Sequence, residues 1–242
     1  MSSKYNRGNK EMNFSDAPAN LDDHVFYGLS LDEEQKVFRD AIYNKDTIIV
    51  ICNSRAGTGK STIALGVGNL LVQYGKYNGI LYIVFPTMEQ RQGYLPGDQE
   101  AKTAPYIQPL LDAMHTLNIA DSCLVTQDNM RGLKEGTAYI EYAADTYLRG
   151  VNFENKVVII EEAQNAYQDT LKKVLTRIHD NCKVIMIGHS EQCDLYKNPQ
   201  NSGFVKYINA FKEVETDPRV AICELHTNHR GWLSTFCDDV KF

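Results

Sequence analysis

Long apolar runs are missing from this sequence, since none approaches the roughly 18 residues that a membrane-spanning helix needs. Residues 1–20 are polar and lack the apolar centre of a signal peptide, so we expect a protein that stays in the cytoplasm. The six cysteines include no CxxC pair, which favours free thiols over disulfides or a metal cluster. Basic charge is not in excess, because 25 Lys and Arg stand against 31 Asp and Glu. The net charge of −6 argues against a surface that binds nucleic acid throughout, and it leaves a local basic patch open.

The sequence also lacks internal repeats, and no low-complexity segment follows the first residues. Its length of 242 residues suits one large domain and is short for two enzymatic domains with a linker. We therefore predict a flexible tail over residues 1–24 and a single folded domain over residues 25–242.

Short apolar runs rich in β-branched residues alternate along the chain with longer amphipathic segments. This alternation predicts a mostly parallel sheet covered by helices on both faces, which is a three-layer α/β/α fold. The expected strands are residues 47–53, 79–85, 157–160, 183–188 and 220–225, and the expected helices are residues 60–74, 106–117, 168–179 and 203–214.

Three further elements are expected from local patterns. Residues 122–126 and 137–143 are predicted as extra strands, the second within a hairpin-like excursion. A helix over residues 29–42 is expected to start with a capping box formed by Ser30 and Glu33.

The segment SRAGTGKS, residues 54–61, follows an expected strand and opens an expected helix. This is the context of a phosphate-binding P-loop, in which consecutive backbone N–H groups surround the phosphates, although GTGKS could also be a plain helix start. Lys60 would reach the outer phosphates of ATP, and Ser61 would offer its hydroxyl to Mg²⁺. Ser54 stands where the pattern has its first glycine, and a serine is harmless there unless the backbone φ angle is positive. The expected nucleotide-binding residues of this segment are Ser54, Arg55, Ala56, Gly57, Thr58, Gly59, Lys60, Ser61 and Thr62.

Two adjacent carboxylates follow the apolar strand at residues 157–160. Because the carboxyl ends of parallel strands share one edge of a sheet, Glu161 and Glu162 are expected to face the P-loop. Glu161 would orient a water bound to Mg²⁺ and so serve the metal together with Ser61, whereas Glu162 would polarise the attacking water. The alternative is a solvated acidic strand end, and the presence of Lys60 upstream favours catalysis.

Several segments in a fixed order make the chain resemble the ATPase domain of the PhoH family, a group whose fold is similar to helicase cores. They are GYLPGDQEAKTAPYIQPLLDAM (93–114), YLRG (147–150), EEAQN (161–165), LTRI (175–178) and GHSEQCDL (188–195). The resemblance covers residues 25–235 and implies a RecA-like P-loop NTPase. The chain departs from the family pattern at Ser54, Arg55, Phe85, Glu161 and His189, where the family has glycine, proline, arginine and two aspartates. These departures bear on the rate of hydrolysis rather than on nucleotide binding.

The resemblance implies roles for residues outside the loop. Gln35 would contact the adenine edge through its amide, and an exposed helix glutamine is the alternative. Gln192 would sense the γ-phosphate from a strand end, and Gln164 would do likewise. Arg177 and Arg230 are candidates for the cation that stabilises the transferring phosphoryl group, from the same or a neighbouring subunit, although arginines on helices are more often surface residues.

The irregular segment over residues 86–109 is a candidate contact for single-stranded nucleic acid, and a plain cover of the sheet is the alternative. It combines cations with aromatic rings that bases could stack on, and Arg149 joins them from another loop. Trp232 could also be a stacking platform, and we expect it in the core instead. The residues concerned in the segment are Arg91, Tyr94, Lys102 and Tyr106.

These features predict a Mg²⁺-dependent ATPase that hydrolyses the β,γ bond of ATP, with RNA or single-stranded DNA as partner and without membrane association. The resemblance also implies a homo-oligomer, such as a hexameric ring, because an arginine that acts in trans needs a neighbouring subunit. The alternative is a nucleotide-dependent binding or assembly module with little or no turnover. Ser54, Glu161 and His189 motivate this alternative.

Overall fold

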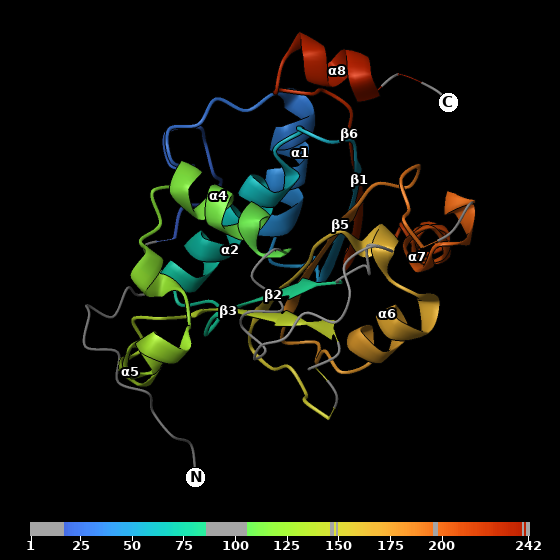
Figure 1. Ribbon diagram of the computed structural model, residues 1–242. Helices are drawn as coiled ribbons and strands as arrows, with labels where there is room; N and C mark the ends of the chain where they lie inside the picture. The colour runs from blue at the N-terminus through green and yellow to red at the C-terminus, as the bar shows by residue number, and fades with distance from the viewer. Residues whose placement is uncertain are drawn as a thin grey trace.

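Six parallel strands form one sheet in the order β3-β2-β4-β5-β1-β6 (Figure 1). The structure is a computed structural model that describes residues 17–85, 106–145, 148, 150–195, 198–238 and 240. The predicted parallel sheet is thereby confirmed. Its strands are β1 (Ile49–Ser54), β2 (Ile80–Val84), β3 (Ile140–Ala144), β4 (Val157–Ile160), β5 (Lys183–Gly188) and β6 (Val220–Leu225).

Helices cover both faces of the sheet, as the alternating pattern predicted (Figure 1). On one face pack α1 (Glu33–Tyr43), α2 (Lys60–Gln73) and α4 (Gln108–Thr116), and on the other pack α6 (Gln168–Leu175) and α7 (Gly203–Lys212). Among the described residues, no helix is long and apolar enough to span a membrane. The shorter elements are α5 (Met130–Glu135), α8 (Trp232–Asp238), and the 3-10 turns η3 (Asp121–Cys123), η4 (Gln127–Asn129), η6 (Ala163–Asn165) and η7 (Pro199–Asn201).

The inner strands are mostly apolar because both faces of the sheet are buried there. Along β1, Val50 and Cys52 pack under α1 and α2, whereas Ile49 and Ile51 pack under α6 and α7. Every residue of β2, β4 and β5 is buried. A parallel sheet between two helical layers produces this pattern in place of alternation.

Three local predictions were wrong. The capping box of α1 is formed by Asp32 and Gln35, and Ser30 takes no part in it. The N–H of Gln35 donates a 2.8 Å hydrogen bond to Oδ1 of Asp32, and the N–H of Asp32 donates a 3.0 Å bond to Oε1 of Gln35. The sequence offers two pairs with the same three-residue spacing, and an aspartate accepts from the helix N–H groups as well as a serine does. The predicted strand at 122–126 is a 3-10 turn followed by an isolated bridge at Leu124, and β3 pairs in parallel with β2 rather than in a hairpin.

The folded part of the chain starts before residue 25, which was the predicted first residue of the domain. Leu21 is 1% exposed within the core under α1 and α2. The hydroxyl of Tyr43 donates a 2.7 Å hydrogen bond to the carbonyl oxygen of Pro18. Residues 17–24 therefore pack against the domain, and residues 1–16 lie outside the described part.

The carboxyl ends of the strands bring distant residues to one edge of the sheet. β5 lies between β1 and β4, so the loop after β1, the acids after β4 and the segment after β5 are neighbours. Asn53 on β1 stands in register with Gly188 on β5. Ligands of open α/β sheets bind at such an edge, which therefore holds the candidate site.

Candidate functional site

The P-loop runs from the end of β1 to the first turn of α2. Gly57 and Gly59 have φ angles of 74° and 78°, in the left-handed region that favours glycine. A Cβ at Gly57 would lie 2.6 Å from Oδ1 of Asn228, so the close approach of a second segment also requires a glycine there. Gly59 precedes α2 without a side-chain hydrogen bond to its first turn. The N–H groups of that turn therefore point at a position suited to an anion.

Ser54 does not distort this loop, although it replaces the first glycine of the pattern. It is the last residue of β1, and it is not among the described non-glycine residues with a positive φ angle. It is 3% exposed, and its Oγ has no hydrogen-bonding partner among the described residues. The serine is thus compatible with the backbone conformation that the loop adopts.

Lys60 and Ser61 occupy the positions expected of a P-loop. The Lys60 ammonium lies 3.4 Å from the carbonyl oxygen of Arg55, so it sits against the backbone of the loop. The Ser61 hydroxyl donates a 3.1 Å hydrogen bond to Oε1 of Glu161. The two residues predicted to share the metal therefore lie side by side, although they come from α2 and from the end of β4.

Glu161 is a buried carboxyl group with an elevated pKa. It is 2% exposed, and its Oε2 accepts a 3.0 Å hydrogen bond from the hydroxyl of Tyr82 on β2. Burial raises the pKa of Glu161 to about 7, although the charge of Lys60 and the hydrogen bonds from Tyr82 and Ser61 oppose the rise. The charge of Glu162 adds to the increase. The ionised form of Glu161 therefore depends on positive charge close by.

Glu162 is held in a different direction from its neighbour. Its φ angle of 51° turns the chain at the end of β4 into the 3-10 turn η6, so the two adjacent acids do not share one orientation. The side-chain amide of the buried Gln164 donates a hydrogen bond to Oε2 of Glu162. The amide oxygen of Gln164 accepts a 3.0 Å bond from the N–H of His189 after β5. Gln164 thus ties the proposed catalytic acid to the neighbouring strand end.

Gln35 and the segment after β6 complete the surroundings of the loop. The amide of Gln35 donates a 2.9 Å hydrogen bond to the carbonyl oxygen of Thr58, and a Cβ at Gly59 would lie 3.1 Å from the same nitrogen. The N–H of His229 donates a 2.9 Å bond to the carbonyl oxygen of Gly57. Arg230 follows directly, and its Cγ would lie 3.0 Å from a Cβ at Gly57. The structure therefore brings the predicted Gln35 and Arg230 to the P-loop.

Arg177 lies apart from the residues around the P-loop, and Gln192 lies at their margin. Arg177 follows α6, its carbonyl oxygen accepts a bond from Phe153, and its guanidinium donates to the carbonyl oxygen of Leu148. Phe153 precedes β4, so the Arg177 backbone lies near the amino end of that strand, whereas Glu161 follows its carboxyl end. Gln192 is exposed in the turn after β5, where its N–H donates to the carbonyl oxygen of His189.

Trp232 was wrongly predicted to be in the core. It is 76% exposed at the start of α8, and its ring stacks on that of Phe236 with 5.5 Å between the centroids. Leu233 on the same short helix is 66% exposed. The apolar residues of this segment suggested burial. The segment instead forms α8, which follows the contact of His229 with Gly57 and lies away from the sheet (Figure 1).

Sequence reasoning missed Tyr82 as a member of the site. An aromatic residue in a strand normally indicates packing, and the sequence did not predict that β2 would lie beside β4, so no signal pointed to this hydroxyl. The predicted nucleic-acid contacts Arg91, Tyr94, Lys102 and Arg149 lie outside the described residues. Tyr106 is described and is partly buried before α4.

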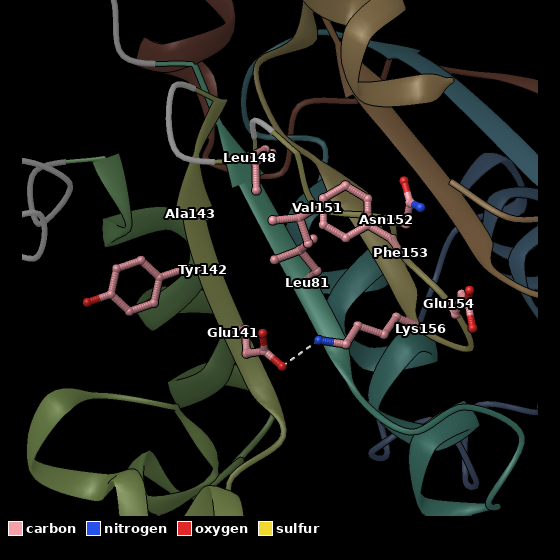
Figure 2. A pocket seen from close by; sticks show the side chains of 10 residues that line it. All are labelled: Leu81, Glu141, Tyr142, Ala143, Leu148, Val151, Asn152, Phe153, Glu154 and Lys156. Carbon is pink, nitrogen blue, oxygen red and sulfur yellow. Dashed lines mark hydrogen bonds and ion pairs between the residues drawn. The ribbon is translucent and has the colours of Figure 1, made fainter. Parts of the chain in front are cut away.

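A hollow of about 410 Å³ lies away from the P-loop and the two acids, on the face of the sheet that carries α6 and α7 (Figure 2). Glu141 and Lys156 point toward one another across it, with 2.5 Å between oxygen and nitrogen, whereas Tyr142 points away (Figure 2). No predicted site residue lines this hollow. Its apolar lining is formed by Leu81, Ala143, Leu148, Val151 and Phe153.

The elevated pKa of Glu161 predicts how the stability of the free protein changes with pH. The folded protein holds the proton up to a pKa of about 7, whereas the unfolded chain releases it near 4.5. This contribution to stability is therefore complete below pH 4.5 and is lost as the pH rises through 7, by about 3 kcal/mol for such a shift. Glu161→Gln should abolish that part of the decline in urea unfolding measured without metal or nucleotide at pH 5 and pH 8.

The matched control is Glu215→Gln, which replaces an exposed carboxylate. The stability of this variant should decline between pH 5 and pH 8 as much as that of the wild type. An equal decline in Glu161→Gln and in the wild type would contradict the buried titration.

Comparisons with known proteins agree with this geometry. The sequence profile described as "PhoH-like protein" matches residues 30–230. A "PhoH-like protein" of Synechocystis is 34% identical over 196 residues, which are 79% of this chain and 55% of that protein. "Protein PhoH" of Escherichia coli is 31% identical over 189 residues, which are 77% of this chain and 51% of that protein. The chain spans about half the length of these curated relatives.

Among solved structures, the large terminase of bacteriophage HK97 superimposes with a TM-score of 0.53 at 13% identity, over 86% of this chain and 43% of that one. At this identity the likeness concerns the fold alone. The sheet order, the loop between β1 and α2, and the profile match over most of the chain lead to one conclusion. The chain belongs to the PhoH-like protein family and has the fold of a P-loop NTPase.

Proposed function

We propose that this protein binds ATP together with Mg²⁺ and hydrolyses the β,γ bond by in-line attack of water. One observation carries the proposal: two adjacent acids at the end of β4 have different partners, and one of them contacts the P-loop. Glu161 accepts a hydrogen bond from Ser61, and Glu162 is held by Gln164. The chemistry of ATP hydrolysis needs these two functions, metal positioning and water activation, at separate points.

The residues that would hold Mg²⁺ are Ser61 and Glu161. Both present oxygen atoms, which Mg²⁺ prefers as ligands, and the two oxygens lie 3.1 Å apart. A buried carboxyl group with a raised pKa also fits a site where a cation stabilises the ionised form. Bound Mg²⁺ would neutralise charge on the β- and γ-phosphate oxygens.

The remaining residues bind the phosphates and activate water. The N–H groups of the loop and of the first turn of α2 would surround the phosphates, with the Lys60 ammonium on the outer ones. Glu162 would accept a proton from the attacking water, and Gln164 fixes its orientation. Gln192 would sense the γ-phosphate, and Arg230 would stabilise charge on the phosphoryl group.

Gln35 remains a candidate for the adenine contact. Its amide oxygen accepts from the N–H of Asp32, and its amide nitrogen donates to Thr58. An amide carries two N–H donors and two lone pairs, so one of each is left for a base. The bond to Thr58 would then transmit the presence of adenine directly to the P-loop.

The test is a steady-state measurement of phosphate release with Mg²⁺ and with EDTA, each with and without single-stranded RNA and DNA. We expect turnover that needs Mg²⁺. If wild-type protein binds ATP and releases no phosphate under any of these conditions, the alternative function applies, namely a nucleotide-dependent binding or assembly module. The family departures at Ser54, Glu161 and His189 favour that alternative.

Coupling to RNA or single-stranded DNA is part of the proposal. The stacked pair of Trp232 and Phe236 is exposed. Arg230 lies in the chain between this pair and His229, whose N–H contacts Gly57 of the P-loop. Exposed aromatic rings beside a cation suit the stacking of unpaired bases. Binding at this place would bear directly on the segment that contacts Gly57, and the nucleic-acid arms of the phosphate-release assay measure the effect.

We also propose that the protein works as a ring-like homo-oligomer in which Arg177 reaches the γ-phosphate of a neighbour. Arg177→Ala should then retain nucleotide affinity and lower turnover, because the contact strengthens as charge develops in the transition state. Activity per subunit should rise with protein concentration. Mixing Arg177→Ala with Lys60→Ala subunits should restore part of the activity, because an intact loop can face an intact arginine.

Lys173→Ala, which removes an exposed cation from α6, is the matched control and should behave like the wild type. Light scattering reports the assembly state across the dilution series. Activity per subunit that stays constant while the assembly dissociates would reject the trans role. The hydrogen bond of Arg177 to Leu148 within its own chain would then be its function.

A further inference from the structure

Two consecutive carbonyl groups of the P-loop accept hydrogen bonds from segments outside the loop. The backbone N–H of His229, after β6, donates a 2.9 Å bond to the carbonyl oxygen of Gly57. The side-chain amide of Gln35, on α1, donates a bond of the same length to the carbonyl oxygen of Thr58. Two parts of the chain that are far apart in the sequence therefore hold two adjacent peptide units of the loop.

These two bonds determine where N–H groups of the loop point. In a trans peptide unit, the C=O and the following N–H lie in one plane and point in opposite directions. Because the carbonyl of Gly57 is directed at His229, the N–H of Thr58 is directed away from it. The carbonyl of Thr58 orients the N–H of Gly59 in the same way. Both N–H groups belong to the loop that would surround the phosphates, so the outside bonds orient donors on which phosphate binding would depend.

The carboxylate of Asp32 connects the two outside segments. Its Oδ1 accepts the 2.8 Å bond from the N–H of Gln35, and its own N–H donates a 3.0 Å bond to Oε1 of Gln35. Its Oδ2 lies 2.9 Å from Nε2 of His229, and this ring nitrogen carries the hydrogen because an ionised carboxylate only accepts. Each oxygen of Asp32 therefore contacts one of the two residues that hold the loop.

The segment after β6 has further contacts that keep it against α1 and the loop. The N–H of His226 donates a 2.7 Å bond to Oε2 of Glu34 on α1. The N–H of Arg230 donates a 2.8 Å bond to Oδ1 of Asn228, and this oxygen would lie 2.6 Å from a Cβ at Gly57. The segment is thus joined to α1 and lies directly against the loop.

We propose that Asp32 is a positioning residue for the phosphates of the nucleotide, which acts through His229 and Gln35 on the peptide units that follow Gly57 and Thr58. This inference rests on the proposed binding of ATP at the P-loop. The side chain of Asp32 is 28% exposed and that of His229 is 45% exposed, and ion pairs this exposed contribute little to stability. Loss of the contact should therefore change nucleotide affinity more than the free energy of unfolding.

The test is calorimetric titration of ATP with Mg²⁺ into full-length variants, together with urea unfolding. Asp32→Ser keeps the cap of α1, because serine caps a helix as well as aspartate does, and it removes the oxygen that contacts His229. It should weaken ATP binding by about threefold to tenfold, the effect of one lost hydrogen bond, and leave unfolding near the wild-type value. His229→Phe should have the same effect. The double variant should bind no more weakly than either single variant, because both changes remove one contact.

A second measurement does not depend on nucleotide. The backbone amide resonances of Thr58 and Gly59 in the free protein should shift in Asp32→Ser and in His229→Phe. The matched control is Asp22→Ser, because Asp22 also accepts a 2.8 Å bond from a backbone N–H three residues later, that of Val25. This variant should leave both the two resonances and ATP affinity unaltered.

Three results would overturn the proposal. Equal ATP affinity in Asp32→Ser and in the wild type would reduce Asp32 to a helix cap. Additive losses in the double variant would show that Asp32 and His229 act separately. Unchanged amide resonances would show that the contact does not orient the loop. Wild-type protein that binds no ATP would instead reject the proposed function, and the resonances would then still decide whether Asp32 orients the loop.

Discussion

Replacement of Glu162 by glutamine is expected to abolish turnover while ATP and Mg²⁺ remain bound. The amide keeps the shape of the side chain and cannot take a proton from water, so phosphate release should fall by about two or more orders of magnitude. Glu161 is unchanged in this variant, and its hydrogen bonds to Ser61 and Tyr82 do not involve the neighbouring side chain. Metal and nucleotide affinity should therefore stay near the wild-type values.

Two measurements separate catalysis from binding in this variant. Single-turnover phosphate release reports the chemical step, and calorimetry with ATP and Mg²⁺ reports binding. Glu215→Gln makes the same change at an exposed site and should release phosphate at the wild-type rate. Equal rates in Glu162→Gln and in the wild type would exclude Glu162 as the group that activates water.

The sheet and the position of the loop could be predicted from the sequence for physical reasons. Residues 157–160 and 184–187 are apolar along their whole length because both faces of a parallel sheet are buried. The pairing of Ser61 with Glu161 followed from topology alone, since the ends of parallel strands meet at one edge. No knowledge of side-chain packing was needed for either prediction.

The contacts that orient these residues could not be predicted in the same way. Tyr82 reaches Glu161 only because β2 lies beside β4, and the strand order is a property of the whole sheet. Gln164 reaches both Glu162 and His189 because the chain turns at a positive φ angle, which a glutamate rarely adopts. Local sequence patterns do not encode such tertiary relations.

Errors at the helix ends had a different physical origin. Ser30 and Asp32 are both good N-cap residues, so local propensity does not distinguish them, and the structure places the cap at Asp32. Trp232 is apolar, yet it belongs to a short helix beyond the last strand, where no sheet face remains to cover it. The hydrophobicity of a residue indicates that burial is favourable, and it does not indicate whether the fold offers a surface that can cover the side chain.

Lys60 is the residue whose loss should weaken ATP binding most. Its ammonium lies at the backbone of the loop, 3.4 Å from the carbonyl oxygen of Arg55, and its charge also acts on Glu161. The first turn of α2 carries no acidic side chain that could repel phosphate. The lysine therefore provides positive charge at a place where the N–H groups of the loop already favour an anion.

Lys60→Ala should weaken ATP binding by about 2 to 4 kcal/mol, because it removes the positive charge that would be hydrogen-bonded to the outer phosphates. This corresponds to roughly a 30-fold to 1,000-fold increase in the dissociation constant measured by calorimetry. Lys172→Ala removes an exposed cation from α6 and should leave ATP affinity unaltered. A folded Lys60→Ala protein that binds ATP as tightly as the wild type would contradict the assignment of residues 54–61 as the nucleotide site, and with it the roles given to Ser61, Glu161 and Glu162.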